Sequence, residues 1–491
     1  MNWYWGDLHI HTNLSYGRGT MQRALAIAKT HLDFTTITGH AFWPDMPTDL
    51  SRFDATIAMH LGGFEKCRRY WNDYAELLRQ ADDDGLLVYP SYEWHSDRFG
   101  DYNVYARNLP LPLVGSESPA DFQKYFSRPD HMMIPHHIGY TRGQRGIDWD
   151  AFADNPLADL VEIYSNHGCA ISDDAPYDYY HEMGPRDGKR TVHAALAQGL
   201  KFGFVASTDS HDGFPGHYSH GRVGVMADTC NREAIWRAML DRKTAAVTGA
   251  RIQAAMTLNG AGIGQTVTAP GKRNLQIRMR GNQPFRAAGI VRNASNIPLP
   301  LPHEAVVDDE VYHVKIEWGW GRKDAETHWD FDLQLSDGEL LDVEPCFRHT
   351  VFDHDGASPH AILDRDSHRL TWTSHTRGTP DSYVHNPQTI TSGVNAVVLT
   401  VRAGADTRLT LDSQRAKIQA DWPRLLQSSV VEHCGGHCSP AVRIGRAYPE
   451  SRCLVEAELE DMPHAEEDWY YLWGTQIDGE SIWVTPIWAG R

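Results

Sequence analysis

Histidines and carboxylates recur along the first half of the chain at the ends of apolar, strand-like runs. The first case is His9-Ile10-His11, where both imidazoles share one face because side chains alternate along a strand. Two such imidazoles can hold one divalent cation, although a lone pair is weak evidence in a chain with 27 histidines. Four later runs repeat the pattern and therefore indicate a metal centre. They end in His40, in Glu93 and His95, in His136 and His137, and in Asp209 and His211.

Helical patterns lie between these runs, for example over residues 21–31 and 64–82. Strands that alternate with helices predict an α/β fold with a parallel sheet or barrel. In such folds the active-site residues gather at the C-terminal ends of the strands, which is where the polar residues fall in this sequence.

These motifs resemble those of the PHP (polymerase and histidinol phosphatase) family, whose pattern covers about the first half of the chain. The resemblance implies a distorted seven-stranded β/α barrel with two or three bound metals. A narrower resemblance, to a branch of large PHP-like proteins within the amidohydrolase-like metallohydrolases, reaches both ends of the chain. It rests on segments 161–168, 207–216 and 476–488.

The resemblance also implies a role for each motif residue. His9, His11 and Asp209 would bind a first metal, and His40 and His211 a third. Glu93 would bridge the first metal to a second, because a shared carboxylate offsets the repulsion between two nearby cations. The implied ligands are His9, His11, His40, Glu93, His136, Asp209 and His211, and Asp101 is a further candidate ligand.

His136 and His137 are consecutive, so they cannot face the same way on a regular strand. The family pattern fits His136 better as a ligand. His137 is then available as a substrate contact or as the general acid. His167 follows the apolar run 160–163 and is a second candidate for proton transfer, whereas Glu162 in that run is expected to be a buried structural carboxylate.

The sequence departs from the family pattern at two places. Residues 13–19 contain no histidine, so a third metal would be weakly held or absent. The family also tends to carry a histidine after the bridging glutamate, where this chain has Asp101. Asp101 could ligate a hard cation or could be a turn residue, and His95 competes with it for the same place.

Three arginines follow predicted strand ends: Arg18, Arg142 and Arg145. Their guanidinium groups suit phosphate or carboxylate, although solvated loop arginines are commoner. The late segment Glu432-His433-Cys434-Gly435-Gly436-His437-Cys438 could supply four zinc ligands. These are crowded into six residues, and we expect a glycine turn with reduced cysteines instead.

Residues 1–250 form the predicted catalytic barrel, whose last helix is expected over 232–242. Residues 251–491 are expected to form a β-rich, sandwich-like domain packed on the barrel, because short alternating segments replace the helical patterns. Expected strands include 274–280, 396–402, 469–472 and 480–487, and residues 297–303 are expected to be a rigid, proline-rich connection.

The net charge of −18 argues against a nucleic-acid surface, and no run approaches the length of a membrane span. Residues 1–5 do not look like a signal peptide, and the seven scattered cysteines imply no disulfide framework, so a cytoplasmic location is expected.

The composite prediction is a metal-dependent hydrolase that acts on a small, anionic molecule. Clustered Zn, Mn or Fe ions would lower the pKa of a bound water and give hydroxide near neutral pH, with Asp209 among the catalytic groups. A phosphoester is the leading substrate on the family resemblance. Hydrolysis of a C–N bond is the alternative, and a non-catalytic metal-binding protein is a third possibility.

Overall fold

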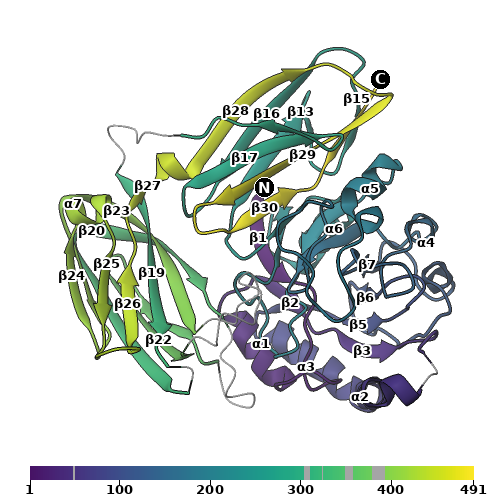
Figure 1. Cartoon of the computed structure of the whole chain (residues 1–491), viewed down its shortest axis with the longest axis horizontal. Coiled ribbons are helices and arrows are strands. Elements are labelled where there is room, and N and C mark those ends of the chain that lie inside the picture. Colours follow the sequence, from purple (N-terminus) through teal and green to yellow (C-terminus); the bar gives the residue numbers. More distant parts are fainter. Residues whose placement is uncertain (48–49, 303–309, 323, 349–357, 379–392) are drawn as a thin grey trace.

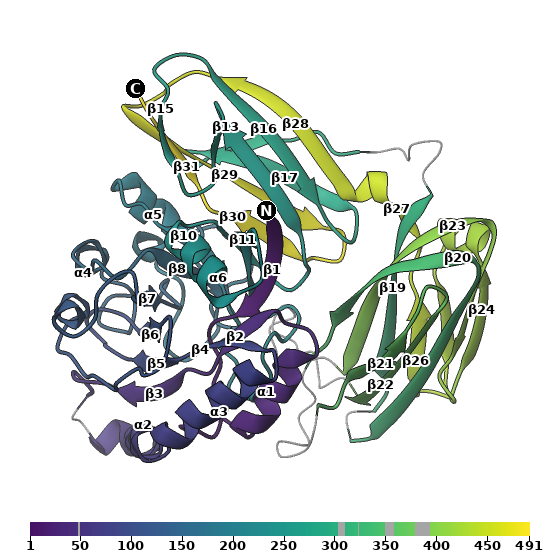
Figure 2. The same cartoon turned by 180° about the vertical axis from the view of Figure 1, so that it is seen from behind.

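The computed structural model describes residues 1–47, 50–302, 310–322, 324–348, 358–378 and 393–491. The structure is a strand-rich α/β arrangement of three lobes, one of which contains nearly all the helices (Figure 1). The view from behind shows the same three lobes, with the chain entering the helical lobe through β1 (Figure 2). None of the helices in the described residues combines the length and the apolar character needed to cross a membrane.

The predicted first and last helices of the helical lobe are confirmed. Helix α1 begins after Thr20, whose side chain accepts a hydrogen bond from Arg23 N, and α6 begins after Asn231, which accepts one from Ala234 N. Both caps satisfy backbone N–H groups that lack a partner in the helix. The α-helices are α1 (Met21–Lys29), α2 (Leu50–Arg69), α3 (Trp71–Asp83), α4 (Trp149–Ala153), α5 (Val192–Ala197), α6 (Arg232–Leu240) and α7 (Trp422–Gln427), and 3-10 turns span Pro119–Lys124, Gly188–Arg190 and Glu450–Cys453.

The helix predicted over residues 64–82 is in fact two helices, which meet at Tyr70, and the first of them extends back to Leu50. Glycines 62 and 63, which are poor helix formers, lie inside α2. Gly63 has a packing role, because a Cβ there would lie 2.7 Å from the ring of Tyr16. The glycine thus lets the loop that follows β1 pack directly on α2.

The strands of the helical lobe belong to three hydrogen-bonded sheets, so a closed seven-stranded barrel stays a prediction. Two of the predicted strands are each divided into two shorter strands. The run that ends in His40 gives β2 (Phe34–Thr36) and β3 (Gly39–Phe42), and the run that contains Glu93 gives β4 (Leu87–Tyr89) and β5 (Ser91–Trp94). In both runs the first strand belongs to one sheet and the second strand, which carries the candidate ligand, belongs to another. Pro90 divides the run of Glu93, because proline has no N–H to pair.

An 11-stranded sheet connects the helical lobe to the C-terminal strands. Its central path runs β15-β31-β29-β30-β12-β11-β1-β2-β4, and pairing of β12 with β30 carries the sheet across the predicted boundary at residue 250. Its other strands are β1 (Asn2–Asp7), β11 (Arg222–Ala227), β12 (Thr244–Val247), β15 (Thr266–Thr268), β17 (Phe285–Arg292), β18 (Ser295–Pro298), β29 (Glu467–Gln476), β30 (Ser481–Val484) and β31 (Ile487–Gly490).

Two smaller sheets complete the helical lobe, and most of the candidate site lies on their strands or just beyond the strand ends. In one, the order is β3-β5-β6-β7, and in the other it is β10-β8-β9. Their remaining strands are β6 (Tyr102–Ala106), β7 (His131–Pro135), β8 (Leu160–Ser165), β9 (Gly168–Cys169) and β10 (Gly203–Ala206).

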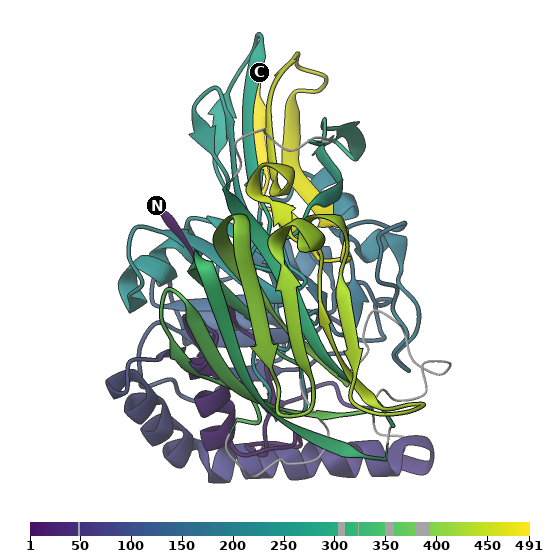
Figure 3. The ribbon, with the colours of Figure 1, turned by 90° about the vertical axis from the view of Figure 1, so that its left-hand side faces the viewer.

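The second half of the chain is rich in β-strands, as predicted, but it forms two lobes with separate cores. One lobe packs a four-stranded sheet against β17, β29 and β31, and the other is a nine-stranded sheet that faces the viewer in Figure 3. The four-stranded sheet contains β13 (Gln253–Leu258), β14 (Ala261–Gly262), β16 (Arg273–Arg280) and β28 (Leu454–Asp461). The nine-stranded sheet contains β19 (Val311–Trp320), β20 (Glu326–Cys346), β21 (Ala361–Arg365), β22 (Arg369–Arg377), β23 (Val394–Asp412), β24 (Lys417–Asp421), β25 (Val430–His433), β26 (Pro440–Ile444) and β27 (Tyr448–Pro449).

Three local expectations for this half need correction. The predicted strand 480–487 is split into β30 and β31, because Pro486 cannot donate a hydrogen bond. The expected rigid connection over 297–303 begins instead as strand β18, which pairs with β17; residue 303 lies outside the described residues. Helical structure does not vanish after residue 250, since α7 follows β24.

Candidate metal centre

The segments of His9-x-His11 and Asp209-x-His211 lie side by side. His11 N donates to Ser210 O at 2.9 Å, and Asp209 N donates to His9 O at 2.8 Å. Asp7 fixes this pairing, because its buried carboxylate accepts hydrogen bonds from Thr208 and from Gly216 N. Asp209 has a positive φ of 49°, a backbone conformation that few non-glycine residues adopt.

Three ligand atoms converge at this point. His9 Nε2 lies 3.0 Å from His11 Nε2, and Asp209 Oδ1 lies 3.4 Å and 3.2 Å from these two nitrogens. With metal–nitrogen bonds of about 2.0–2.1 Å, ligands of a tetrahedral cation lie about 3.4 Å apart. The spacing of these three donors therefore suits one divalent cation.

Glu93 faces two sets of donors with its two carboxylate oxygens. Its strand β5 pairs in parallel with β3, so that Glu93 lies opposite His40. The contacts of Oε2 are His11 Nε2 at 3.3 Å, His40 Nε2 at 3.4 Å and His9 Nε2 at 3.6 Å, and those of Oε1 are His136 Nε2 at 3.1 Å and His95 Nδ1 at 3.3 Å. This arrangement is the one expected of a carboxylate that bridges two cations.

The bridging position fits a cation on physical grounds. Glu93 Oε2 is buried and accepts no hydrogen bond from the residues that the structure describes. An ionised, buried oxygen without a hydrogen bond is costly unless a positive charge lies beside it. A cation would supply that charge.

Several of the histidines are held neutral, which leaves a nitrogen lone pair for a metal. Burial lowers the pKa of His136 and of His211 to about 3. Four groups of donors have ligand atoms close enough to share an ion. They are His9, His11 and Asp209; His11, His40 and His211; His40, Glu93 and His95; and Glu93, Asp101, His136 and His137. All the predicted ligands belong to at least one group, although one imidazole nitrogen can serve only one ion.

Two side chains orient the ligand histidines from outside. Glu162 Oε2 lies 3.1 Å from His9 Nδ1, so Nδ1–H can donate to the carboxylate and direct the Nε2 lone pair toward Asp209. Ser15 Oγ lies 2.8 Å from His40 Nδ1 in the same way. Such partners fix the tautomer of a metal-binding histidine. Glu162 was predicted to be buried and hydrogen-bonded, and the structure adds its contact with His9.

His136 and His137 face the same group of donors, because both lie beyond the regular strand on which they would face opposite ways. Strand β7 ends at Pro135, and His137 has a φ of 32°. The alternation of side chains between the two faces of a strand therefore does not apply to His137. His137 Nε2 lies 3.3 Å from Asp101 Oδ2 and belongs to the same donor group as His136. Backbone conformation after a strand end decides this geometry, and the sequence carries no clear signal for it.

His167 lies beside the donors without belonging to a donor group. Its Nε2 is 3.0 Å from Asp209 Oδ2, while Asp209 Oδ1 faces His9 and His11. The hydroxyl of Tyr140 is 2.7 Å from His167 Nδ1, and burial raises the pKa of Tyr140, which keeps that hydroxyl protonated. His167 is therefore held between Asp209 and Tyr140 at the edge of the donor cluster.

A cavity of about 980 Å³ opens on the donors. Glu93, His137, His167, Asp209 and His211 are among the predicted residues that line it. Its wall also contains Tyr16, Trp43, His60 and His181, which sequence reasoning missed. Tyr16 stands in the stretch that lacks a histidine and stacks on His40 at 3.6 Å between ring centroids. His60 lies within α2, far along the sequence from any strand end.

Only one of the three predicted arginines lines this cavity. Arg145 does so, with 15% of its side chain exposed. Arg18 is exposed, and Arg142 is 46% exposed and pairs with Asp148 at 2.7 Å.

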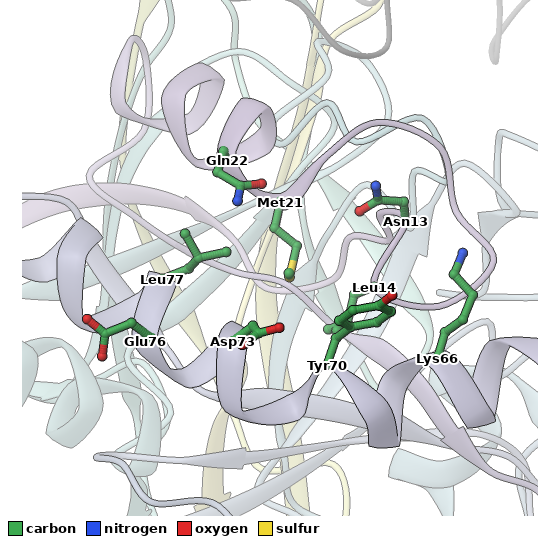
Figure 4. A pocket seen from close by; sticks show the side chains of 9 residues that line it. All are labelled: Asn13, Leu14, Met21, Gln22, Lys66, Tyr70, Asp73, Glu76 and Leu77. Atoms are coloured by element: carbon green, nitrogen blue, oxygen red, sulfur yellow. The ribbon is translucent and has the colours of Figure 1, made fainter.

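Two further places in the described residues offer fewer groups for chemistry. The segment 432–438 forms the hairpin between β25 and β26, with Cys438 exposed, and none of the donor groups found among the described residues lies there. A second hollow, of about 520 Å³, lies where α1, α2 and α3 meet the loop after β1. Lys66, Asp73 and Glu76 line it together with apolar side chains, and it contains neither histidine nor cysteine (Figure 4).

Comparison with known proteins gives distant likenesses. No family model matches the chain. An uncharacterized protein of Chlamydia muridarum is 25% identical over 155 residues, which is 28% of this chain and 25% of that protein. An uncharacterized protein of Chlamydia pneumoniae is 25% identical over 202 residues, which is 38% of this chain and 32% of that protein. The match thus spans a quarter to a third of the length of these relatives.

Among solved structures, one similar chain is described as a two-domain protein containing a predicted PHP-like metal-dependent phosphoesterase from Bacteroides vulgatus. It is 13% identical in sequence, and the alignment covers 85% of this chain and 95% of that one. The TM-score of 0.32 is too low to show a shared fold.

Proposed function

We propose that this protein is a metal-dependent hydrolase with a PHP-type catalytic barrel, and that it hydrolyses a phosphoester of a small, anionic molecule. The observation that carries the proposal is the position of Glu93, whose two oxygens face separate sets of histidines at the floor of a cavity. Divalent cations held there would supply a water activated near neutral pH and would stabilise charge on the substrate oxygens.

The chain's own residues complete the proposed site. His9, His11 and Asp209 would hold the first cation, and Glu93 with His136 would hold a second. Arg145 provides a positive charge in the cavity wall that can bind an anionic group of the substrate. His167, held between Asp209 and Tyr140, gives a proton to the leaving group. His137 is the alternative donor, because it also lines the cavity.

Turnover of an aryl phosphate monoester and diester by protein loaded with Mn or Zn tests the proposal. Arg145→Ala should lower kcat/KM by about 10- to 100-fold at saturating metal, because a charge-assisted contact contributes about 1.5–3 kcal/mol. Arg142→Ala is the matched control and should behave as wild type, since Arg142 does not line the cavity. Failure to hydrolyse either ester, together with turnover of an anilide, would favour a C–N hydrolase instead.

A further inference from the structure

Arg145 is fixed against the metal-ligand candidate Asp101. Its Nε donates to Asp101 Oδ2 at 2.8 Å, and Nη2 donates to the same oxygen. The guanidinium lies over the ring of Trp43, 5.2 Å from its centroid. These contacts hold a permanent positive charge at the edge of the donor cluster.

The oxygen that Arg145 occupies is also the one that faces the second set of donors. His137 Nε2 lies 3.3 Å and His136 Nε2 lies 4.0 Å from Asp101 Oδ2. The other oxygen, Oδ1, accepts a hydrogen bond from Ser96 N at 3.0 Å. A cation on the Asp101 side and the guanidinium therefore require the same carboxylate oxygen.

The charge of Arg145 adds to this competition. Arg145 Nη2 also lies 3.9 Å from Glu93 Oε1, the oxygen that faces His136. A second divalent cation would have to bind beside the guanidinium against a repulsive charge.

We propose that Arg145 acts as a built-in positive charge that competes with a second divalent cation for Asp101, and so limits how tightly that cation binds. The first cation, at His9, His11 and Asp209, does not meet this competition, because no contact joins Arg145 to those three residues in the described structure. The inference rests on the proposed metal centre and concerns the number of cations that are tightly held.

Equilibrium dialysis against Zn or Mn at a series of free concentrations, with metal counted by mass spectrometry, tests the inference. Arg145→Gln should bind the second equivalent at least 10-fold more tightly than wild type, with the first equivalent unchanged. Arg142→Gln is the matched control and should match wild type. If the competition acts through Asp101, the gain should disappear in the double variant Arg145→Gln with Asp101→Asn.

An affinity for the second equivalent that is unchanged or weaker in Arg145→Gln would overturn the inference. If circular dichroism shows that Arg145→Gln does not fold, the titration is repeated with Arg145→Lys, which keeps the charge but cannot donate two hydrogen bonds to Asp101 in the same geometry. Arg145→Lys should bind the second equivalent more tightly than wild type, by a smaller factor, and an unchanged affinity would overturn the inference. Protein that binds no metal in any form would overturn the proposed function as well, so the two failures are distinguishable.

Discussion

Glu162→Gln should weaken binding of the first cation without unfolding the protein. Glu162 is buried and lies 3.1 Å from His9 Nδ1. The change replaces a carboxylate with an amide of almost the same shape, so the packing around β8 is kept. What is lost is the charge that holds Nδ1 protonated and leaves Nε2 free for the metal.

The magnitude follows from the strength of that contact. A hydrogen bond to a charged group contributes about 1.5–3 kcal/mol, and about 1.4 kcal/mol corresponds to a tenfold change in Kd. The Kd of the first cation should therefore rise about 10- to 100-fold, which is the usual cost of removing such an orienting partner. A competition titration with a chromophoric chelator measures this Kd, and circular dichroism verifies the fold.

The matched control is Glu344→Gln. Glu344 is also a buried glutamate, and it accepts hydrogen bonds from Arg251 N at 2.7 Å and from Asn282 Nδ2 at 2.8 Å. It belongs to none of the donor groups. Wild-type affinity in Glu162→Gln, or an equal loss in Glu344→Gln, would refute the reasoning.

Three other predictions concern the bridge, acid stability and the late cysteines. Glu93→Gln should lose metal and activity together while its circular dichroism stays unchanged; unchanged metal content would place the bridge elsewhere. Burial lowers the pKa of His193 to about 4, whereas the unfolded chain takes up the proton near its ordinary pKa of about 6.5, so Tm should fall as pH decreases between these values. His193→Gln should flatten that dependence, and an equally steep profile would count against it. Cys434→Ser with Cys438→Ser should leave metal content and Tm nearly unchanged, and loss of one zinc equivalent would show the expectation to be wrong.

The sequence indicated which donor residues come together better than it indicated how the strands of the second half are arranged. Alternation along a strand paired His9 with His11 in advance, and the family resemblance alone added Asp209 to them. The position of His137 could not be predicted, because it depends on a positive φ after the strand has ended. Tyr16 was missed for a similar reason, since its contact with His40 depends on how a loop packs on α2 through Gly63.

The architecture of the second half illustrates the same limit on a larger scale. Alternating segments correctly indicated β-strands there, but strand partners are far apart in sequence. For example, β16 pairs with β28, and β19 pairs with β23. Local patterns do not determine such pairings, so one expected sandwich became two β lobes. The pairing of β12 with β30 could not be predicted either, because these two strands are also far apart in the sequence.

The metal content of the wild-type protein tests the central claim most directly. Protein purified without chelator should contain at least one equivalent of Zn, Mn or Fe by elemental analysis, because the donors around Glu93 and Asp209 leave buried negative charge to be neutralised. Loading with Mn or Zn should raise this content. Protein that remains metal-free both before and after loading would contradict the account.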